Sequence, residues 1–239
     1  MNNINPYNNS EKKKTQIINM FDNISQTYDL LNMLLSFRMD YIWRKKTIKY
    51  INNYPKKILD IATGTADLAI MAAKYTNATI TGIDISNKML RVGNKKIKKF
   101  KLSNRISLQL ADAENLPFKN NSFQAITSGF GVRNFQNINL GLSEMYRVLE
   151  NDGILLILEP SKPSIFPIKQ IYNTYFTYVL PFLGKIISKD KMAYTYLKNS
   201  VNEFYTKKTF LKKLKKIGFK DCKHIPITFG IVSLYIAKK

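Results

Sequence analysis

The chain has 239 residues, 45% of them hydrophobic, which is enough for one α/β domain with a substantial core. Its single cysteine, Cys222, excludes an intramolecular disulfide and a thiolate metal cluster, and suits a reducing cytoplasm. The net charge of +22 favours an anionic partner, and a membrane surface is favoured over nucleic acid. A drift of the whole composition toward lysine explains the charge better than either, because the lysines are spread along the chain. The N-terminus is polar and no apolar run is long enough to span a bilayer, so we expect a cytoplasmic protein, with peripheral contact at the inner face of the membrane left open.

Residues 11–54 carry apolar side chains at helical spacing. Ile17, Phe21 and Ile24 make one apolar face, and two further groups follow around Leu31 and Trp43. This pattern predicts helices that cap the rest of the protein rather than a separate domain.

One stretch organises the chain, an apolar run followed directly by a glycine turn. The run from Ile58 to Ile61, which contains Asp60, is too short for a helix and predicts a buried strand. Gly64 follows, and helix-forming residues begin at Thr65, whose hydroxyl is a candidate cap for the first helical turn. A strand that enters a helix through a glycine turn exposes backbone N–H groups to a ligand.

A second acid stands at the end of the next predicted strand, 78–84. Asp84 lies twenty positions after Gly64, the spacing at which doubly wound folds bind a ribose, and a carboxylate can accept from both ribose hydroxyls. The turn lacks the G-x-G-x-x-G pattern of dinucleotide sites. S-adenosylmethionine, which has a ribose but no phosphate, therefore fits better, although an ordinary strand–helix connection is the alternative.

The following segment adds a helix and a third strand. Ser86 is a candidate N-cap, and four lysines near the helix C-terminus predict a solvated face: Lys95, Lys96, Lys98 and Lys99. The third strand, 105–110, ends just before Asp112 and Ala113. These two residues could bond adenine through a side chain and the backbone, or they could form a plain turn.

The fourth strand, 123–127, opens into a glycine-punctuated loop that carries Arg133. Such a loop lies at the edge where parallel sheets bind their ligands. A helix at 140–149, a turn at 151–153 and a buried strand at 154–158 follow.

The segment 161–205 is rich in aromatic residues and broken by prolines. We expect an irregular apolar lid suited to a greasy substrate, although most of these aromatics could simply be core. A basic helix and two strands follow. The whole chain is expected to be one domain, with a cap at 11–54, a cofactor-binding core at 56–160, the lid at 161–205 and a C-terminal helix and strands at 206–239.

Short motifs spread over nearly the whole chain form one pattern. They are Phe21-Asp-x-Ile-x-x-x-Tyr28-Asp29, Leu35-Ser36-Phe37, Trp43-Arg44, the glycine turn, Asp112-Ala113-Glu114-x-Leu116-Pro117-Phe118, Gly129-Phe130-Gly131-Val132-Arg133-Asn134, Arg147-Val148-Leu149, Leu158-Glu159-Pro160-Ser161-Lys162-Pro163, Tyr194-x-Tyr196-Leu197-x-x-Ser200 and Gly218-Phe219. This set resembles the UbiE/MenG/Coq5 quinone C-methyltransferases.

The resemblance implies a class I, Rossmann-like S-adenosylmethionine-dependent methyltransferase, with a seven-stranded, mostly parallel sheet whose last strand is antiparallel. We expect this α/β core to carry an N-terminal helical cap and a helical lid insertion. It also implies that a reduced polyprenyl quinone accepts the methyl group. The positions that contact the cofactor in the family correspond here to Thr65, Asp84, and Asp112 with Ala113. We add Gly64 and Asp60 of the same turn as candidate cofactor-binding residues, and we expect no metal site.

Three positions depart from the family pattern, and the sequence of the glycine turn favours one branch of the family. Gln124 replaces a common aspartate, Asp40 stands where relatives often have histidine, and Gly129 replaces a cofactor-contacting serine of some members. The Gly-Thr-Ala-Asp form of the turn is more typical of the menaquinone branch.

Methylating a quinol ring carbon requires an electron-rich ring, yet a phenol titrates near pH ~10. The enzyme should therefore remove the hydroxyl proton, stabilise the phenolate, or both. Arg133 could stabilise the oxyanion, unless it only forms a salt bridge that holds its loop, and Asn134 could orient the hydroxyl. The candidate bases are Asp40, Asp29 and Glu159, whereas His224 is expected to be structural.

The function expected first is conversion of demethylmenaquinol to menaquinol, the last step of menaquinone biosynthesis. A methoxy-polyprenyl-benzoquinol of the ubiquinone pathway is the alternative acceptor. An RNA methyltransferase and a non-catalytic membrane-binding scaffold are the rivals from other classes, but we expect no nucleic acid partner, and a homodimer is left open. The chain has neither the Asn/Asp-Pro-Pro-Tyr motif of amino-methylating enzymes nor the cysteine pair needed for C5 methylation, which argues against RNA as the substrate.

Overall fold

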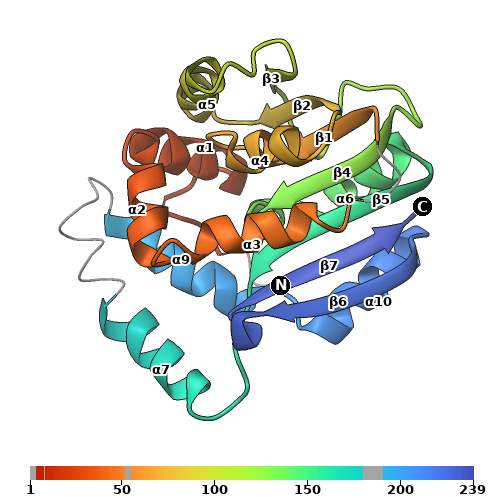
Figure 1. Cartoon of the computed structure of the whole chain (residues 1–239). Helices are drawn as coiled ribbons and strands as arrows, with labels where there is room; N and C mark the ends of the chain where they lie inside the picture. The colour runs from red at the N-terminus through yellow and green to blue at the C-terminus, as the bar shows by residue number, and fades with distance from the viewer. Residues whose placement is uncertain (1–3, 8, 52–54, 180–190) are drawn as a thin grey trace.

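The computed structural model describes residues 4–7, 9–51, 55–179 and 191–239. Within these ranges, seven strands form one sheet in the order β3-β2-β1-β4-β5-β7-β6 (Figure 1). The strands are β1 (Lys57–Ile61), β2 (Thr79–Asp84), β3 (Ile106–Leu110), β4 (Phe123–Gly129), β5 (Leu149–Pro160), β6 (Lys220–Ile227) and β7 (Val232–Lys238). The end of the predicted cap and residues 180–190 of the predicted lid lie outside the described residues.

Strands β1 to β5 pair in parallel, and β7 runs antiparallel to both β5 and β6. The predicted mostly parallel sheet with an antiparallel last strand is confirmed. Strand β1 is buried over Ile58–Ile61 because helices cover both faces of the sheet, which explains its continuous apolar run.

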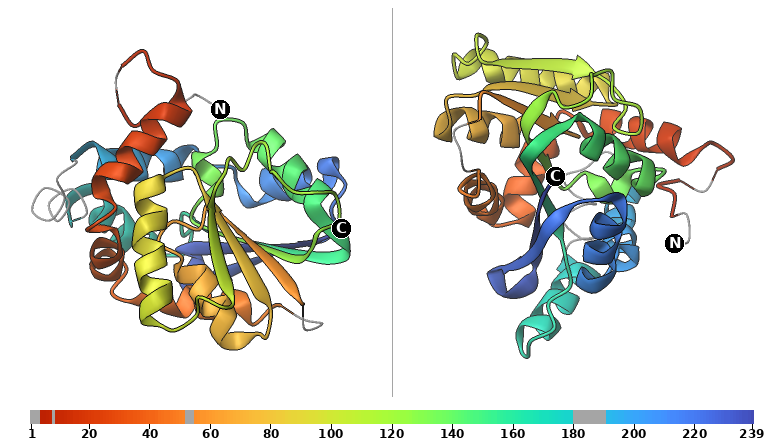
Figure 2. Two further views of the ribbon diagram at one scale, coloured as in Figure 1. Left: turned by 90° about the horizontal axis from the view of Figure 1, so that it is seen from above. Right: turned by 90° about the vertical axis from the view of Figure 1, so that its right-hand side faces the viewer.

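Helices pack on both faces of this sheet (Figure 2). One hydrophobic cluster joins Leu59 and Ile61 of β1 to α6 (Ile138–Val148) and α10 (Lys207–Ile217). A second cluster joins Ile58 to α4 (Asp67–Tyr75), and it also contains Ile97 of α5 (Asn87–Lys99) and Ile48. Alternate side chains of β1 therefore anchor opposite helical layers.

The cap and the lid meet at the carboxyl ends of the parallel strands (Figure 1). The cap consists of α1 (Lys13–Ile24), α2 (Tyr28–Leu35) and α3 (Met39–Ile48). The predicted lid contains α7 (Ile168–Thr174), a π-helical turn η2 (Tyr175–Val179) and α9 (Lys191–Glu203), so the prediction of a helical lid insertion is confirmed and the segment is more regular than its prolines suggested. Apolar contacts between α1, α2 and α9 hold the two parts together.

The turn predicted at 151–153 is also different in the structure, because these residues continue β5. Pairing shifts there from Phe123 opposite Leu149 to Ala125 opposite Ile154, and Asp152 has a left-handed φ of 61°. The turn-forming residues thus make a bulge inside one strand. None of the helices in the described ranges has the length and apolar character needed to cross a membrane.

Candidate active site

The turn after β1 brings Gly64 and Asp84 together. The backbone N–H of Gly64 donates to Oδ2 of Asp84 over 2.8 Å, and the N–H of Ser86 donates to Oδ1 over 2.8 Å. Gly64 has a φ of +55°, and a Cβ built there would meet nothing within 4 Å. The turn therefore needs glycine for its backbone conformation and leaves space beside it for a ligand.

The carboxyl of Asp84 at this turn has an altered pKa. Burial raises its pKa from 3.8 to about 6, although the N–H groups of Ser86 and Gly64 oppose that rise. The predicted cap at Ser86 is confirmed, because its hydroxyl accepts from the N–H of Met89 over 3.1 Å at the start of α5.

A small cavity of about 70 Å³ opens at this turn. It brings together four of the predicted cofactor-binding residues and one predicted catalytic residue: Gly64, Asp84, Asp112, Ala113 and Asn134. Lys14 of α1 closes it at one side, where its Nζ lies 2.5 Å from Oδ2 of Asp112 and 3.1 Å from Oε2 of Glu114.

Asp60 and Thr65 lie outside the lining of this cavity. Oδ1 and Oδ2 of Asp60 accept from the hydroxyls of Thr127 and Thr63, each over 2.6 Å, and burial raises the pKa of Asp60 to about 6. The predicted cap at Thr65 is wrong, because Ala66 takes the N-cap position and the Thr65 hydroxyl donates to Asp29 over 2.5 Å. Both side chains therefore bond to neighbouring protein groups rather than to the space of this cavity.

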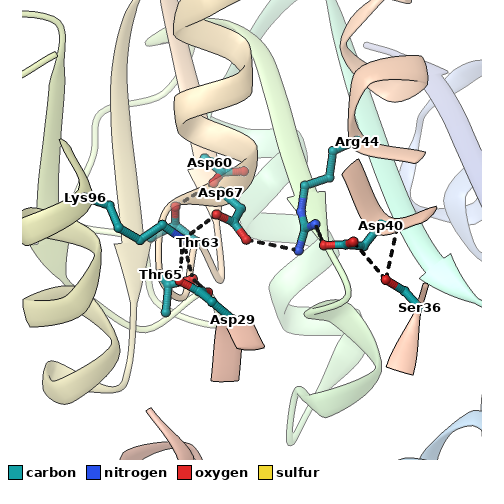
Figure 3. Close-up of polar contacts among 9 residues, drawn as sticks. All are labelled: Asp29, Ser36, Asp40, Arg44, Asp60, Thr63, Thr65, Asp67 and Lys96. Atoms are coloured by element: carbon teal, nitrogen blue, oxygen red, sulfur yellow. Dashed lines mark hydrogen bonds and ion pairs between the residues drawn. The ribbon is translucent and has the colours of Figure 1, made fainter. Parts of the chain in front are cut away.

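A chain of charged groups links this turn to the cap (Figure 3). Lys96 pairs with Asp29 over 2.7 Å and also with Asp67, so the expectation of a solvated face fails at this lysine. Asp67, in the first turn of α4, lies 3.5 Å from Nη2 of Arg44 on α3. Nη1 of Arg44 in turn lies 2.5 Å from Asp40.

A larger cavity of about 390 Å³ lies between the cap, the loop after β4 and the lid. Phe21, Tyr28 and Phe130 line both cavities, so the two adjoin. Most of the lining is apolar, and its charged side chains are Asp40, Arg44 and Arg133. Such a cavity suits an apolar molecule that bears a few polar atoms.

Arg133 lines the larger cavity while pairing with a buried acid. Its Nη1 lies 3.0 Å from Oε2 of Glu159 and also donates to the carbonyl of Phe130, and its backbone N–H donates to Oε1 of Glu159 over 3.3 Å. Burial raises the pKa of Glu159, although the guanidinium opposes this. Glu159 is fully buried and lines neither cavity, so the ion pair positions Arg133.

Asn134 lies between the two cavities. Its Oδ1 accepts from the hydroxyl of Tyr196 over 3.1 Å, and Tyr196 lines the larger cavity. The amide of Asn134 donates to the carbonyl of Phe130 over 3.4 Å. The loop after β4 thus brings both Arg133 and Asn134 to the junction of the cavities.

Of the three candidate bases, Asp40 alone lines the larger cavity. Burial would raise its pKa, but the charge of Arg44 and the hydroxyl of Ser36 lower it below the ordinary value. Asp40 is therefore ionised but a weak proton acceptor. His224 lines neither cavity, and its Nε2 lies 2.8 Å from Oγ of Ser233.

Two residues of the larger cavity escaped the sequence reasoning. Arg44 is 6% exposed, and the Trp43-Arg44 motif was a signal that could have found it. Among the described residues, Tyr172 of α7 has a buried hydroxyl without a hydrogen-bond partner, and its side chain lines this cavity. No sequence pattern singles out one tyrosine among the fourteen.

The sequence profile of the ubiE/COQ5 methyltransferase family matches residues 9–239. The chain belongs to that family. A demethylmenaquinone methyltransferase of Bacteroides fragilis is 44% identical over 238 residues, covering 99% of this chain and 97% of the relative. A UbiE ubiquinone/menaquinone biosynthesis C-methyltransferase of Geotalea daltonii is 42% identical over 231 residues, covering 95% and 98%.

Solved structures share the fold at low sequence identity. The cyclase SpnF has a TM-score of 0.68 and 15% identity, covering 95% of this chain and 96% of its own. An S-adenosylmethionine-dependent methyltransferase of Thermotoga maritima has a TM-score of 0.66 and 17% identity, covering 92% and 99%. The likeness to a cyclase illustrates that such a fold alone does not fix the reaction.

As a ubiE/COQ5 family member, the chain is an S-adenosylmethionine-dependent methyltransferase. The turn fits that cofactor, because Gly64 leaves open space and the carboxyl of Asp84, at the end of β2, lines the cavity beside it. The alternative of a non-catalytic scaffold is set aside by the family match, and the matches give no support to an RNA methyltransferase.

Proposed function

We propose that this chain transfers a methyl group to a ring carbon of demethylmenaquinol, which yields menaquinol as the last step of menaquinone biosynthesis. The observation that carries the proposal is the large apolar cavity, which adjoins the small polar cavity through Phe21, Tyr28 and Phe130. The Bacteroides fragilis and Porphyromonas gingivalis relatives, 44% and 41% identical, carry the name demethylmenaquinone methyltransferase.

When bound, S-adenosylmethionine would supply a methyl group from its sulfonium centre, and the sulfur–methyl bond would break as the ring carbon gains the methyl group, which leaves the neutral thioether S-adenosylhomocysteine. We propose that Asp84 binds the ribose hydroxyls, that Gly64 allows close approach of the backbone, and that Asp112 and Ala113 bond the adenine. All four line the small cavity. Asp60 and Thr65 act from behind, by holding the turn through Thr127, Thr63 and Asp29.

The quinol must become more electron-rich before its ring carbon attacks the methyl group. We propose that Arg133 stabilises the developing phenolate, since it is the one guanidinium held in the loop at the junction of the cavities. Asn134 orients the acceptor from the small-cavity side, and the unpaired hydroxyl of Tyr172 bonds a quinol oxygen. Because its pKa is lowered, Asp40 relays the hydroxyl proton to solvent, directly or through water, only once Arg133 stabilises the phenolate, and the ring proton that the methyl group displaces returns to the quinol oxygen through solvent.

A methoxy-polyprenyl-benzoquinol is the second candidate acceptor. The Geotalea daltonii relative, 42% identical, has a name that covers both ubiquinone and menaquinone biosynthesis. The Gly-Thr-Ala-Asp sequence at residues 64–67 favours the naphthoquinol. We also propose that the enzyme acts in the cytoplasm, with peripheral contact to the membrane. A homodimer is part of the proposal as an open alternative.

The proposal can be tested in a menaquinone-making bacterium whose own quinone methyltransferase gene is deleted. Expression of this chain should restore menaquinone, identified in lipid extracts as a quinone heavier by one CH₂ unit. The Asp84→Asn variant, expressed to the same level, should restore much less. Accumulated demethylmenaquinone beside abundant wild-type protein would contradict the proposal.

A further inference from the structure

Three exposed apolar side chains surround the mouth of the large cavity. Phe37, between α2 and α3, is 74% exposed; Ile171 of α7 is 63% exposed; and Phe229, between β6 and β7, is 66% exposed. All three also line the cavity, although they come from distant parts of the chain. We call Phe37, Ile171 and Phe229 the rim.

Cap and lid are in contact beside the rim. The ring of Phe37 lies 6.0 Å from that of Tyr175, and the hydroxyl of Tyr175 donates to the carbonyl of Leu35 over 2.8 Å. Figure 1 shows α7 and the turn between β6 and β7 on the same side of the molecule, below α3. The rim therefore belongs to one continuous mouth.

The backbone presents both rim phenylalanines at a conformational cost. Phe37 has a φ of 51° and Phe229 a φ of 55°, and neighbouring Arg38 and Thr228 are also left-handed, at 63° and 48°. Such angles are unfavourable for bulky residues. Both side chains nevertheless remain mostly exposed against the described part of the chain.

The charges near the rim favour an anionic partner. The segments 30–39, 161–179 and 224–235 contain no aspartate or glutamate, whereas Arg38, Lys162 and Lys169 are exposed cations. A second copy of a chain with net charge +22 would bring like charges together at this face. An anionic lipid surface instead offers both hydrocarbon for the rim and opposite charge for the cations.

We propose that the rim docks on the surface of an anionic lipid bilayer, so that the mouth of the large cavity faces the hydrocarbon. The inference rests on the proposed function in one respect, because the polyprenyl tail of the proposed substrate is soluble in the bilayer and not in water. The quinol ring would then enter the cavity while its tail stays in the bilayer, and the cofactor would bind from the aqueous side.

Flotation with quinol-free vesicles tests this surface. The wild-type chain should bind phosphatidylcholine vesicles that contain phosphatidylglycerol, and it should bind pure phosphatidylcholine more weakly. The rim variant Phe37→Asn/Ile171→Gln/Phe229→Asn should bind at least tenfold more weakly, since asparagine tolerates a positive φ but carries no apolar surface. The matched control is Leu140→Gln, because Leu140 of α6 is 51% exposed and lines neither cavity.

S-adenosylmethionine affinity and the thermal unfolding midpoint report whether the rim variant is folded, and both should stay close to wild type. Equal vesicle binding by the rim variant and the Leu140→Gln control would overturn the proposal. The proposal would also be overturned if the wild-type chain bound no vesicles and sedimented as a dimer, and the rim variant sedimented as a monomer. Because the vesicles hold no quinol, the result is independent of whether the chain methylates one.

Discussion

The two adjoining cavities bind by different physical means. The small one presents the carboxyl of Asp84 at a turn between a strand and a helix, where the backbone N–H of Gly64 holds that carboxyl. The large one is mainly apolar and is bounded by the cap and the lid, with Arg133 and Arg44 each paired with an acid. Directional hydrogen bonds suit a polar cofactor of fixed shape, whereas an apolar cavity under helices suits a greasy acceptor that enters and leaves.

The largest expected effect concerns Arg133 at the junction. Arg133→Gln should lower kcat about 10²–10³-fold through loss of oxyanion stabilisation, with little change in cofactor affinity. It should also cost about 3–5 kcal/mol of unfolding free energy, because Glu159 is left buried and unpaired. The measurements are kcat, cofactor calorimetry and denaturant unfolding.

The control for that prediction is Arg133→Gln combined with Glu159→Gln. The double variant should recover most of the stability but none of the turnover, because the phenolate still lacks its cation. Recovery of both would mean that Arg133 only holds the loop.

Asp84 and Asp60 form a matched pair of acids on the cofactor side. Both are acids with a pKa raised to about 6, but Asp84 lines the small cavity and Asp60 does not. Asp84→Asn should weaken S-adenosylmethionine binding by about 10- to 100-fold, the effect of losing charged hydrogen bonds. Asp60→Asn should change affinity much less. Similar losses in both, by calorimetry, would show that Asp84 acts only through the turn.

Cofactor binding and folding should respond to pH with opposite signs. An ionised Asp84 is needed for the ribose, so affinity should fall below pH 6, by at most tenfold per pH unit, and Asp84→Asn should flatten this dependence. The raised pKa of Asp60 favours its protonated form in the fold, so its stabilising contribution is complete below pH 3.8 and is lost as pH rises through about 6. Calorimetry and urea unfolding at several pH values, on wild type and Asp60→Asn, measure both trends. Parallel curves for wild type and variant would contradict the assignment.

Tyr172 tests whether the large cavity offers a polar atom to the acceptor. Tyr172→Phe removes a buried hydroxyl that lacks a partner among the described residues, so folding should gain slightly or stay unchanged. The KM for the quinol should nevertheless rise about fivefold, the value of one hydrogen bond of about 1 kcal/mol. A lower stability with an unchanged KM would mean that the hydroxyl serves the lid alone.

The smallest effect should come from the chain of charged groups that links the turn to the cap. Lys96→Met should loosen Asp29 and Asp67 beside the turn and weaken cofactor binding a few-fold, since the side chains of these acids are 37% and 32% exposed. The exposed Lys98 on the same helix provides the control, and Lys98→Met should behave as wild type. Identical cofactor affinities for the two variants would show that the chain does not support the turn.

The cofactor side could be predicted from the sequence because its parts are local. A strand, a glycine turn and an acid at the end of the next strand determine where Gly64, Asp84 and the Ser86 cap lie. Spacing could not say which side of the turn faces the ligand. Asp60, a neighbour of that turn, and Thr65, named from the resemblance, do not line the small cavity, and their side chains bond to Thr127 and Asp29 instead.

The acceptor side could not be predicted because it depends on tertiary contacts. The hydrogen bond of Tyr196 with Asn134 joins residues 62 positions apart, and a tyrosine in an aromatic-rich segment gives no sign of such a partner. The prolines of the lid suggested irregular structure, but α7 begins directly after Pro167, where a proline is compatible with a helix. The class of acceptor could be predicted only from the family resemblance. The apolar periodicity of residues 11–54 predicted cap helices but not what they cover.

The central claim is that a quinol in the large cavity takes the methyl group from a cofactor in the small one. Its most direct test is methyl transfer from labelled S-adenosylmethionine to reduced demethylmenaquinone, with a reduced methoxy-polyprenyl-benzoquinone assayed in parallel. We predict label in the naphthoquinol ring, with turnover strongly reduced by Arg133→Gln. Label in neither quinol, from protein that binds the cofactor, would contradict the account.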